Sequence, residues 1–168
     1  MRWIDRALPF MLLPLLAGSA LADDKPLPDA IAAPGETVVL KVHAIGLQLY
    51  ECKAGADGKL AWTFTAPQAT LNAGDKEVGQ HGAGPSWELT DGSSITGKVA
   101  ASAPGATSGD IPWLKLDVVA HKGSGQLSGV TTVQRINTIG GQLKDACDRA
   151  DASRGMPYSA DYVFLRKP

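Results

Sequence analysis

After residue 37, short runs in which apolar and polar residues alternate dominate the chain. In residues 113–121, Leu114, Leu116 and Val118 fall on one face, and residues 47–52 alternate in the same way. This period of two is typical of a half-buried β-strand, because successive side chains point to opposite faces of a sheet. The 3.6-residue period of an amphipathic helix is almost absent, so the pattern predicts a β protein.

Turn residues separate these runs, and Asp91-Gly92-Ser93 is one example of a hairpin signal. We predict strands at residues 37–44, 47–52, 60–65, 77–81, 87–90, 94–101, 113–121, 130–137 and 158–165. We expect residues 67–71 to be irregular or helical, and residues 140–157 to form a polar loop or short helix. Short connections favour antiparallel pairing, so the expected fold is all-β, a single antiparallel β-sandwich or small β-barrel domain.

The N-terminus has the pattern of a secretory signal peptide. Arg2 and Arg6 precede an apolar run over residues 7–16, and Ala20-Leu21-Ala22 closes a stretch of small residues. The run is too short to span a bilayer and the small residues fit a cleavage site, so a cleaved signal is favoured over a core helix. The mature protein is therefore expected to be exported, to the periplasm or to the outside of the cell.

Two parts follow this signal. Residues 23–36 hold Pro26, Pro28 and Pro34 among small and charged residues, which predicts an N-terminal arm or short helix outside the core. The rest of the chain carries all the predicted strands and fits the length of one domain. The expected organisation is a cleaved signal peptide (1–22), an N-terminal arm (23–36) and a single β-domain (37–168).

The charge of the chain narrows the range of partners. The formal net charge is −1, and a nearly neutral chain lacks the basic footprint of a nucleic-acid-binding protein. It also lacks a lysine-rich patch for a membrane surface. We expect no nucleic acid and no membrane span after signal cleavage, which leaves a small molecule or a cell-envelope component as partner.

Two glycine-rich segments resemble nucleotide-binding loops but lack the context of such loops. Residues 92–98 read G-S-S-I-T-G-K, yet Val99 stands where a phosphate-binding loop has Ser or Thr, and no helix follows. Residues 123–129 lead into another strand-like run, whereas a dinucleotide site needs a helix there. We therefore expect no nucleotide and no cofactor.

The chain has 2 cysteines, Cys52 and Cys147. In an exported protein a single pair of cysteines is expected to form a disulfide. The alternative is a redox-active pair, but such pairs have close spacing such as C-x-x-C, which is absent here. A structural bridge is the favoured interpretation, and it would tie the late polar loop to the sheet.

The 3 histidines, His43, His81 and His121, are the candidates for a metal site. Three imidazoles can hold zinc or copper and leave one position open. The spacing neither supports nor excludes such a site, because it shows no His-x-His or His-x-x-x-His pair. The ordinary interpretation is three unrelated histidines at strand ends and turns.

His81 is the strongest single candidate for a ligand site. It precedes a Gly-Ala-Gly-Pro segment and lies near Trp87 and Glu88, a mixture of small, aromatic and acidic residues that is found around pockets. Trp113 is the further candidate for a ligand contact, although tryptophans more often anchor a core. No nucleophile elbow or free thiol is visible. We therefore expect a non-enzymatic binding module, with a metal-binding protein or metal-dependent enzyme centred on His81 as the alternative.

Several motifs together carry a resemblance to a known family. They are Tyr50-x-Cys52, Trp62-x-Phe64-x-Ala66-Pro67, Gly79-x-His81-x-Ala83-Gly84-Pro85-x-Trp87-Glu88, Ile111-Pro112-Trp113-Leu114, Gln134-Arg135-x-Asn137-Thr138-x-Gly140-Gly141 and Pro157-Tyr158-x-Ala160-x-Tyr162. With these motifs the chain resembles the exported bacterial and fungal proteins called domain of unknown function 3455. The resemblance implies one domain over nearly the whole mature chain, and the disulfide. It implies no catalytic residues.

Overall fold

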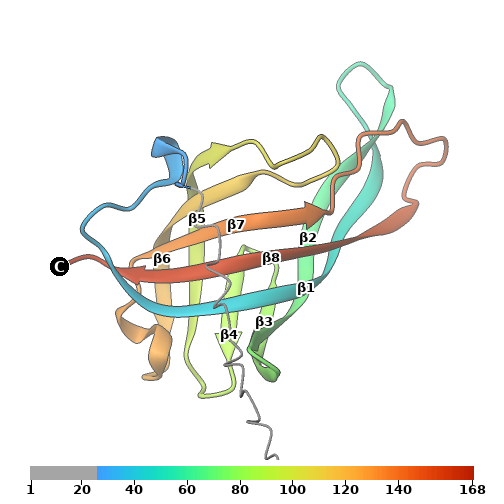
Figure 1. Cartoon of the computed structure of the whole chain (residues 1–168). Coiled ribbons are helices and arrows are strands. Elements are labelled where there is room, and N and C mark those ends of the chain that lie inside the picture. Colours follow the sequence, from blue (N-terminus) through green and yellow to red (C-terminus); the bar gives the residue numbers. More distant parts are fainter. Residues whose placement is uncertain (1–25) are drawn as a thin grey trace, which may run out of the picture.

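The computed structural model describes residues 26–168, so the predicted signal peptide over residues 1–22 lies outside the described residues. Eight strands and two short 3-10 helices make up the domain (Figure 1). In chain order they are η1 (Asp29–Ile31), β1 (Thr37–Ala54), β2 (Leu60–Ala73), β3 (Lys76–Gly82), β4 (Ser86–Leu89), β5 (Ser94–Ala103), β6 (Trp113–Lys122), η2 (Gln126–Gly129), β7 (Thr132–Gly140) and β8 (Ser153–Arg166). Among the described residues, no helix is long and apolar enough to cross a membrane.

The strands form one antiparallel sheet that closes on itself. Each strand pairs with its neighbour in the sequence, and β8 pairs with β1 along most of its length. In Figure 1, β1, β8 and β7 cross the front of the molecule side by side, and β3 to β5 form the wall behind them. The prediction of an all-β, antiparallel fold is confirmed. Of the two folds expected, a β-sandwich or a small β-barrel, the closed sheet is the barrel. An up-and-down barrel of eight strands is just wide enough to hold one small ligand.

Strand β1 is continuous where two strands were expected. Gly46, which the sequence suggested as an interruption, lies opposite Ala69 in the regular pairing with β2. A Cβ at this position would collide with the backbone carbonyl oxygen of Gln68. The glycine therefore allows a close approach of two strands and does not end one of them.

The expectations for residues 67–71 and for the start of the last strand were wrong. Residues 67–71 belong to β2, where Ala69 and Leu71 are buried against the core. Their small and proline-containing sequence hid the period of two. Strand β8 begins at Ser153, within the segment expected to be a loop, because the early part of β8 pairs with the end of β1.

The interior is filled at one end of the barrel. Inward-facing apolar residues from all parts of the sheet pack there, and Leu127 of η2 and the adjacent Val130 close this end with no exposed surface. The arm contributes on the outside, where η1 lies against β5 and β6 and Ile31 is fully buried. The Gln134 side chain of β7 donates to the Ile31 carbonyl over 2.7 Å. Ile31 is therefore buried between the arm and the outer face of the sheet, apart from the core inside the barrel.

The disulfide between Cys52 and Cys147 is confirmed. It links the end of β1 to the loop between β7 and β8, with the two Cα atoms 5.9 Å apart. Two backbone hydrogen bonds support it: Cys52 N–H donates to the Ala152 carbonyl, and Asp151 N–H donates to the Cys52 carbonyl. The loop is thereby tied to the protruding β1–β2 hairpin at the open end of the barrel.

Candidate functional site

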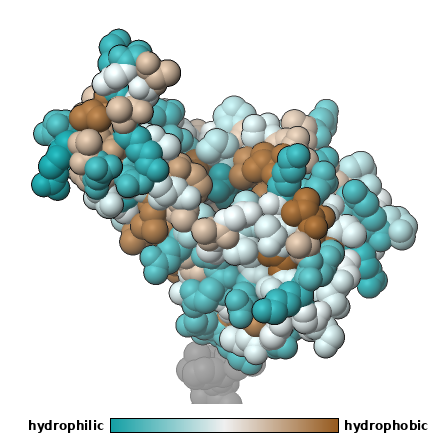
Figure 2. Space-filling view, turned by 180° about the vertical axis from the view of Figure 1, so that it is seen from behind, coloured by the Kyte–Doolittle hydropathy of each residue, from teal (hydrophilic) through white to brown (hydrophobic). Residues whose placement is uncertain are grey.

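The barrel opens into a cavity of about 650 Å³ at the end opposite η2. The opening follows from strand length, since β3 and β4 are short and form a low part of the wall. Strand β2 pairs with β3 only from Ala69 onward, and β5 pairs with β4 only from Ser94 to Thr96. Figure 2 shows the surface hollowed between the protruding lobe and the barrel body, with apolar side chains on both sides.

Nineteen described residues line this cavity, and most are apolar or aromatic. They are Gln48, Tyr50, Trp62, Phe64, Thr65, Pro67, His81, Gly84, Pro85, Trp87, Val99, Ile111, Pro112, Leu114, Leu116, Arg135, Gln142, Leu143 and Tyr162. Apolar walls with a few convergent polar groups, in a volume of about 300–1,000 Å³, are characteristic of small-molecule sites.

Three packed aromatic rings, two of them stacked, form the inner end of the cavity. His81 of β3 and Trp87 of β4 lie opposite one another in the register, and their rings stack with centroids 4.7 Å apart and planes within 9°. The Tyr162 ring of β8 meets both edge-on, at 4.9 Å and 5.5 Å. Phe164 packs against Trp87 from the filled side of the barrel. The stack therefore joins the cavity to the core.

The protonation of His81 is fixed by its surroundings. Its Nδ1 lies 2.7 Å from the Ser86 carbonyl oxygen, which only accepts, so Nδ1 carries the proton. Burial, with a smaller effect of the Arg135 cation, lowers the pKa of His81 to about 4, against the opposing effect of the hydrogen bond to Ser86. The imidazole is therefore neutral at pH 7, and Nε2 is an acceptor.

This low pKa makes the stability of the protein depend on pH. A buried histidine with a folded-state pKa near 4 resists protonation, whereas the unfolded chain binds the proton near pH 6.5. Stability is full above pH 6.5 and falls as the pH is lowered towards 4, by about 3 kcal/mol for this residue. Urea unfolding of wild type and His81→Gln between pH 7 and pH 4 measures it. We expect the free energy of unfolding of His81→Gln to depend much less on pH than that of wild type, and that of His121→Gln to depend on pH as wild type does. An equal pH dependence in all three proteins would contradict the low pKa of His81 as its cause.

Two further polar side chains enter the cavity wall from β1 and β7. Gln48 is 2% exposed, and its side-chain nitrogen has no partner among the described residues. Arg135 donates hydrogen bonds from Nε and Nη2 to the Pro112 carbonyl oxygen, over 3.1 Å and 2.9 Å. Close by, the Tyr50 hydroxyl donates to the Gly141 carbonyl over 2.8 Å, and burial raises the pKa of this tyrosine.

Of the four residues predicted to contact a ligand, two line the cavity and two lie outside it. His81 and Trp87 line the cavity. Glu88 is exposed, and its two strand neighbours Trp87 and Leu89 point into the barrel. Trp113 is half-buried beside the inward-facing Leu114, and it is not among the cavity residues.

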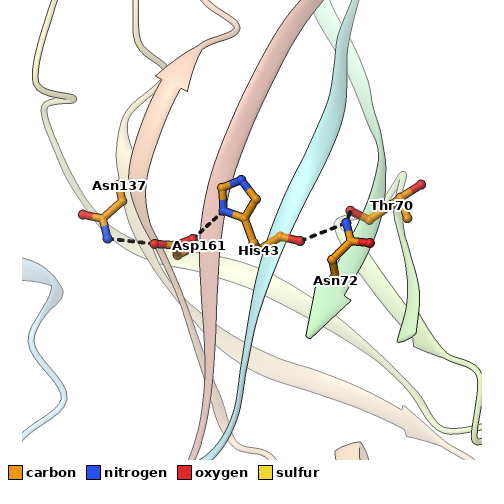
Figure 3. Close-up of polar contacts among 5 residues, drawn as sticks. All are labelled: His43, Thr70, Asn72, Asn137 and Asp161. Carbon is orange, nitrogen blue, oxygen red and sulfur yellow. Dashed lines mark hydrogen bonds and ion pairs between the residues drawn. The ribbon is translucent and has the colours of Figure 1, made fainter. Parts of the chain in front are cut away.

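The three histidines do not come together. His43 is exposed on the outer face of β1, where its Nδ1 contacts the Asp161 carboxylate at 2.7 Å and Asn137 donates to the same carboxylate (Figure 3). His121 is exposed and bonded through Nε2 to the Val130 carbonyl, while His81 is inside the barrel. Among residues 26–168, no three His, Cys, Asp or Glu side chains gather as a metal site would require, so the metal alternative is not favoured.

Comparison with known proteins identifies the family of this chain. A family model described as a protein of unknown function, DUF3455, matches residues 33–166. The chain belongs to the DUF3455 family. No curated protein and no solved structure matches it. The match to DUF3455 contains every cavity residue and both cysteines, so the site lies wholly within the family domain.

The sequence patterns of this DUF3455 protein did not single out Gln48 and Arg135 as site residues. A signal for Arg135 was present, because it shares strand parity with the apolar Val133, and a charged residue on an apolar face points to a special role. Gln48 gave the opposite signal, since its neighbours Leu47 and Leu49 are more apolar than it is. Gln48 faces inward because β1 is one continuous strand, in which Gln48 has the same parity as the buried Val42 and Ala44.

Proposed function

We propose that this protein is an exported, non-enzymatic binding module that holds one small amphipathic molecule in the barrel cavity. The observation that carries the proposal is the cavity of about 650 Å³, with apolar walls and polar groups at its inner end. This is the arrangement that encloses the apolar body of a ligand and orients its polar end.

The mouth of the cavity supports an apolar contact surface. Phe64 is 48% exposed and Val99 is 49% exposed, and both line the cavity beside Trp62. Large apolar groups that stay in water lose the stabilisation that burial would give, roughly 25 cal/mol for each Å². A ligand seated between these side chains would cover them, which supplies the driving force for binding.

The disulfide supports both the location and the rigidity of the site. Structural disulfides persist in oxidising compartments, which agrees with export of the mature chain. The bridge from Cys52 to Cys147 also restrains the loop that carries Gln142 and Leu143, two residues of the cavity wall. A preformed wall lowers the ordering cost of binding.

A cavity-filling substitution tests the proposal. We expect wild type to bind the neutral fluorescent probe 1-N-phenylnaphthylamine with one site per chain, with enhanced and saturable emission. Val99→Trp places a large ring in the mouth and is expected to weaken binding by about tenfold or more, since about 1.4 kcal/mol of lost contact gives that factor. The matched control is Val119→Trp on the outer face of β6, where Val119 is 60% exposed and outside the cavity.

Fluorescence titration of the three proteins measures the effect, and thermal melting confirms that each is folded. Equal affinity in wild type and in both variants would place the probe elsewhere and refute the cavity as the binding site. The absence of saturable binding by folded wild type, for this probe and for a panel of apolar compounds of similar size, would refute the proposed function itself.

A further inference from the structure

We propose that the ligand is an amphipathic carboxylate, of which the carboxylate group binds to Arg135 and the apolar body fills the cavity towards its mouth. This inference rests on the proposed function and names the chemical class of the ligand. It follows from the charge of the cavity wall, from the free donors of Arg135 and from three buried polar groups.

The cavity carries a single positive charge. Arg135 is the one Lys, Arg, Asp or Glu residue among the described residues that line it, and His81 is neutral. None of the ion pairs formed by the described residues includes Arg135. A partly buried guanidinium without a carboxylate partner is costly in an apolar wall, and an anionic ligand group would remove that cost.

The contacts of Arg135 leave part of its donor set available. Its Nε and Nη2 share the Pro112 carbonyl oxygen, so two of the five N–H groups are engaged there. This anchor fixes the plane of the guanidinium at the cavity wall. The remaining N–H groups can meet the two oxygens of a carboxylate, the geometry in which arginine binds this group most strongly.

Three nearly inaccessible side chains add unsatisfied polar groups to the same wall. Gln48, Trp87 and Tyr162 are 2%, 1% and 1% exposed. The Gln48 amide nitrogen, the Trp87 indole nitrogen and the Tyr162 hydroxyl are buried without a hydrogen bond of regular geometry among the described residues, although Tyr158 lies beside both Gln48 and Tyr162, and Arg135 lies beside Tyr162. Buried donors are normally paired with protein, ordered water or a ligand. These three atoms have almost no accessible surface, so they make the wall around Arg135 polar, and Arg135 supplies the donors that a ligand can reach.

The donor set fits a carboxylate better than a phosphate. One guanidinium balances one negative charge, and the other groups at the inner end are neutral. A phosphate monoester carries about −1.5 to −2 at neutral pH and would keep part of its charge uncompensated in an apolar cavity. A carboxylate offers two acceptor oxygens and a single charge, which matches the single charge and the remaining N–H groups of Arg135.

Competition between two ligands of equal chain length tests the inference. Decanoate below its micelle concentration and decanol below its solubility limit, at a pH where the acid is ionised, are used to displace 1-N-phenylnaphthylamine. We expect wild type to bind decanoate about 10- to 100-fold more tightly than decanol, from the usual strength of hydrogen bonds to charged groups. Arg135→Gln is expected to bring the two affinities within about threefold, mainly by weakening decanoate.

Matched variants separate the causes. Arg166→Gln removes an exposed arginine near the closed end of the barrel and is expected to keep the wild-type preference. Arg135→Lys retains the charge without the planar fork and is expected to keep part of the preference. If Arg135→Gln no longer binds the neutral probe, Arg135→Lys becomes the test of the carboxylate preference. A lysine variant that binds the probe but shows no preference for decanoate over decanol overturns the inference.

The outcomes distinguish the inference from the proposed function. Equal binding of decanoate and decanol by wild type, with the neutral probe still bound and still excluded by Val99→Trp, would overturn the carboxylate and leave the cavity as a binding site. Failure of all three compounds to bind folded wild type would overturn both. A preference for decanoate that survives Arg135→Gln unchanged would also contradict the role of Arg135.

Discussion

Replacement of Trp87 with alanine is expected to lower the free energy of unfolding by about 3–5 kcal/mol, the usual cost of removing a fully buried tryptophan. Trp87 is 1% exposed and contacts His81, Tyr162 and Phe164 through its ring. The alanine variant would enlarge the cavity into the core and remove the stacking partner of His81. Urea unfolding at pH 7 measures the change.

Trp62→Ala is the control for Trp87→Ala. Trp62 is half-buried at the mouth of the cavity, and its best-defined partner is the Arg154 guanidinium, 5.4 Å from the ring centroid. A cation–π contact at an exposed site contributes about 0.5–1 kcal/mol, so we expect Trp62→Ala to lose less than half as much stability as Trp87→Ala. Similar losses in the two variants would show that the aromatic stack is not the junction between core and cavity.

Removal of the disulfide is expected to lower the free energy of unfolding by about 2–4 kcal/mol. Cys52 and Cys147 are 95 residues apart, so the bridge restricts a long loop of the unfolded chain. In the folded protein it holds the loop between β7 and β8, which is attached to β2 by a single bridge between Ala61 and Ala146. The double variant Cys52→Ser, Cys147→Ser and the reduced wild type should melt alike, and both below the oxidised protein.

Thiol titration under denaturing conditions provides the control for this prediction. Oxidised protein should show no free thiol, and the reductant should leave the melting of the double serine variant unchanged. Two free thiols in protein recovered from an oxidising compartment would contradict the bridge. A melting temperature that is the same with and without reductant, with the thiols shown to be reduced, would contradict its contribution to stability.

Local patterns in the sequence were sufficient to predict the presence of most strands and the disulfide, although not all strand boundaries. The period of two in residues 113–121 and the turn at Asp91-Gly92-Ser93 both arise from contacts between near neighbours, and both appear in the structure. Gly92 has a φ of 84°, a backbone conformation that a hairpin turn favours and glycine adopts without strain. The pairing of Cys52 with Cys147 needed only the count of cysteines and an oxidising location.

Long-range pairing decided what the sequence left open. Closure of the barrel depends on β8 meeting β1, and no local pattern in either strand specifies that partner. The same closure brings Gln48 and Arg135 to the wall of one cavity, although they lie on β1 and β7 and are far apart in the chain. His81 and Trp87 were found because a short hairpin brings them together, so their proximity is a local property.

Backbone amide NMR during a titration with decanoate locates the ligand site and so tests whether it is the barrel cavity. We expect the largest shift changes at Tyr50, Phe64 and Arg135, which surround the cavity, with saturation at one ligand per chain. The outer face offers a clear alternative, since Ile45 and Ile139 are 59% and 68% exposed there. Shift changes confined to Ile45, Ile139 and their neighbours would show that the ligand binds outside the barrel and not in the cavity.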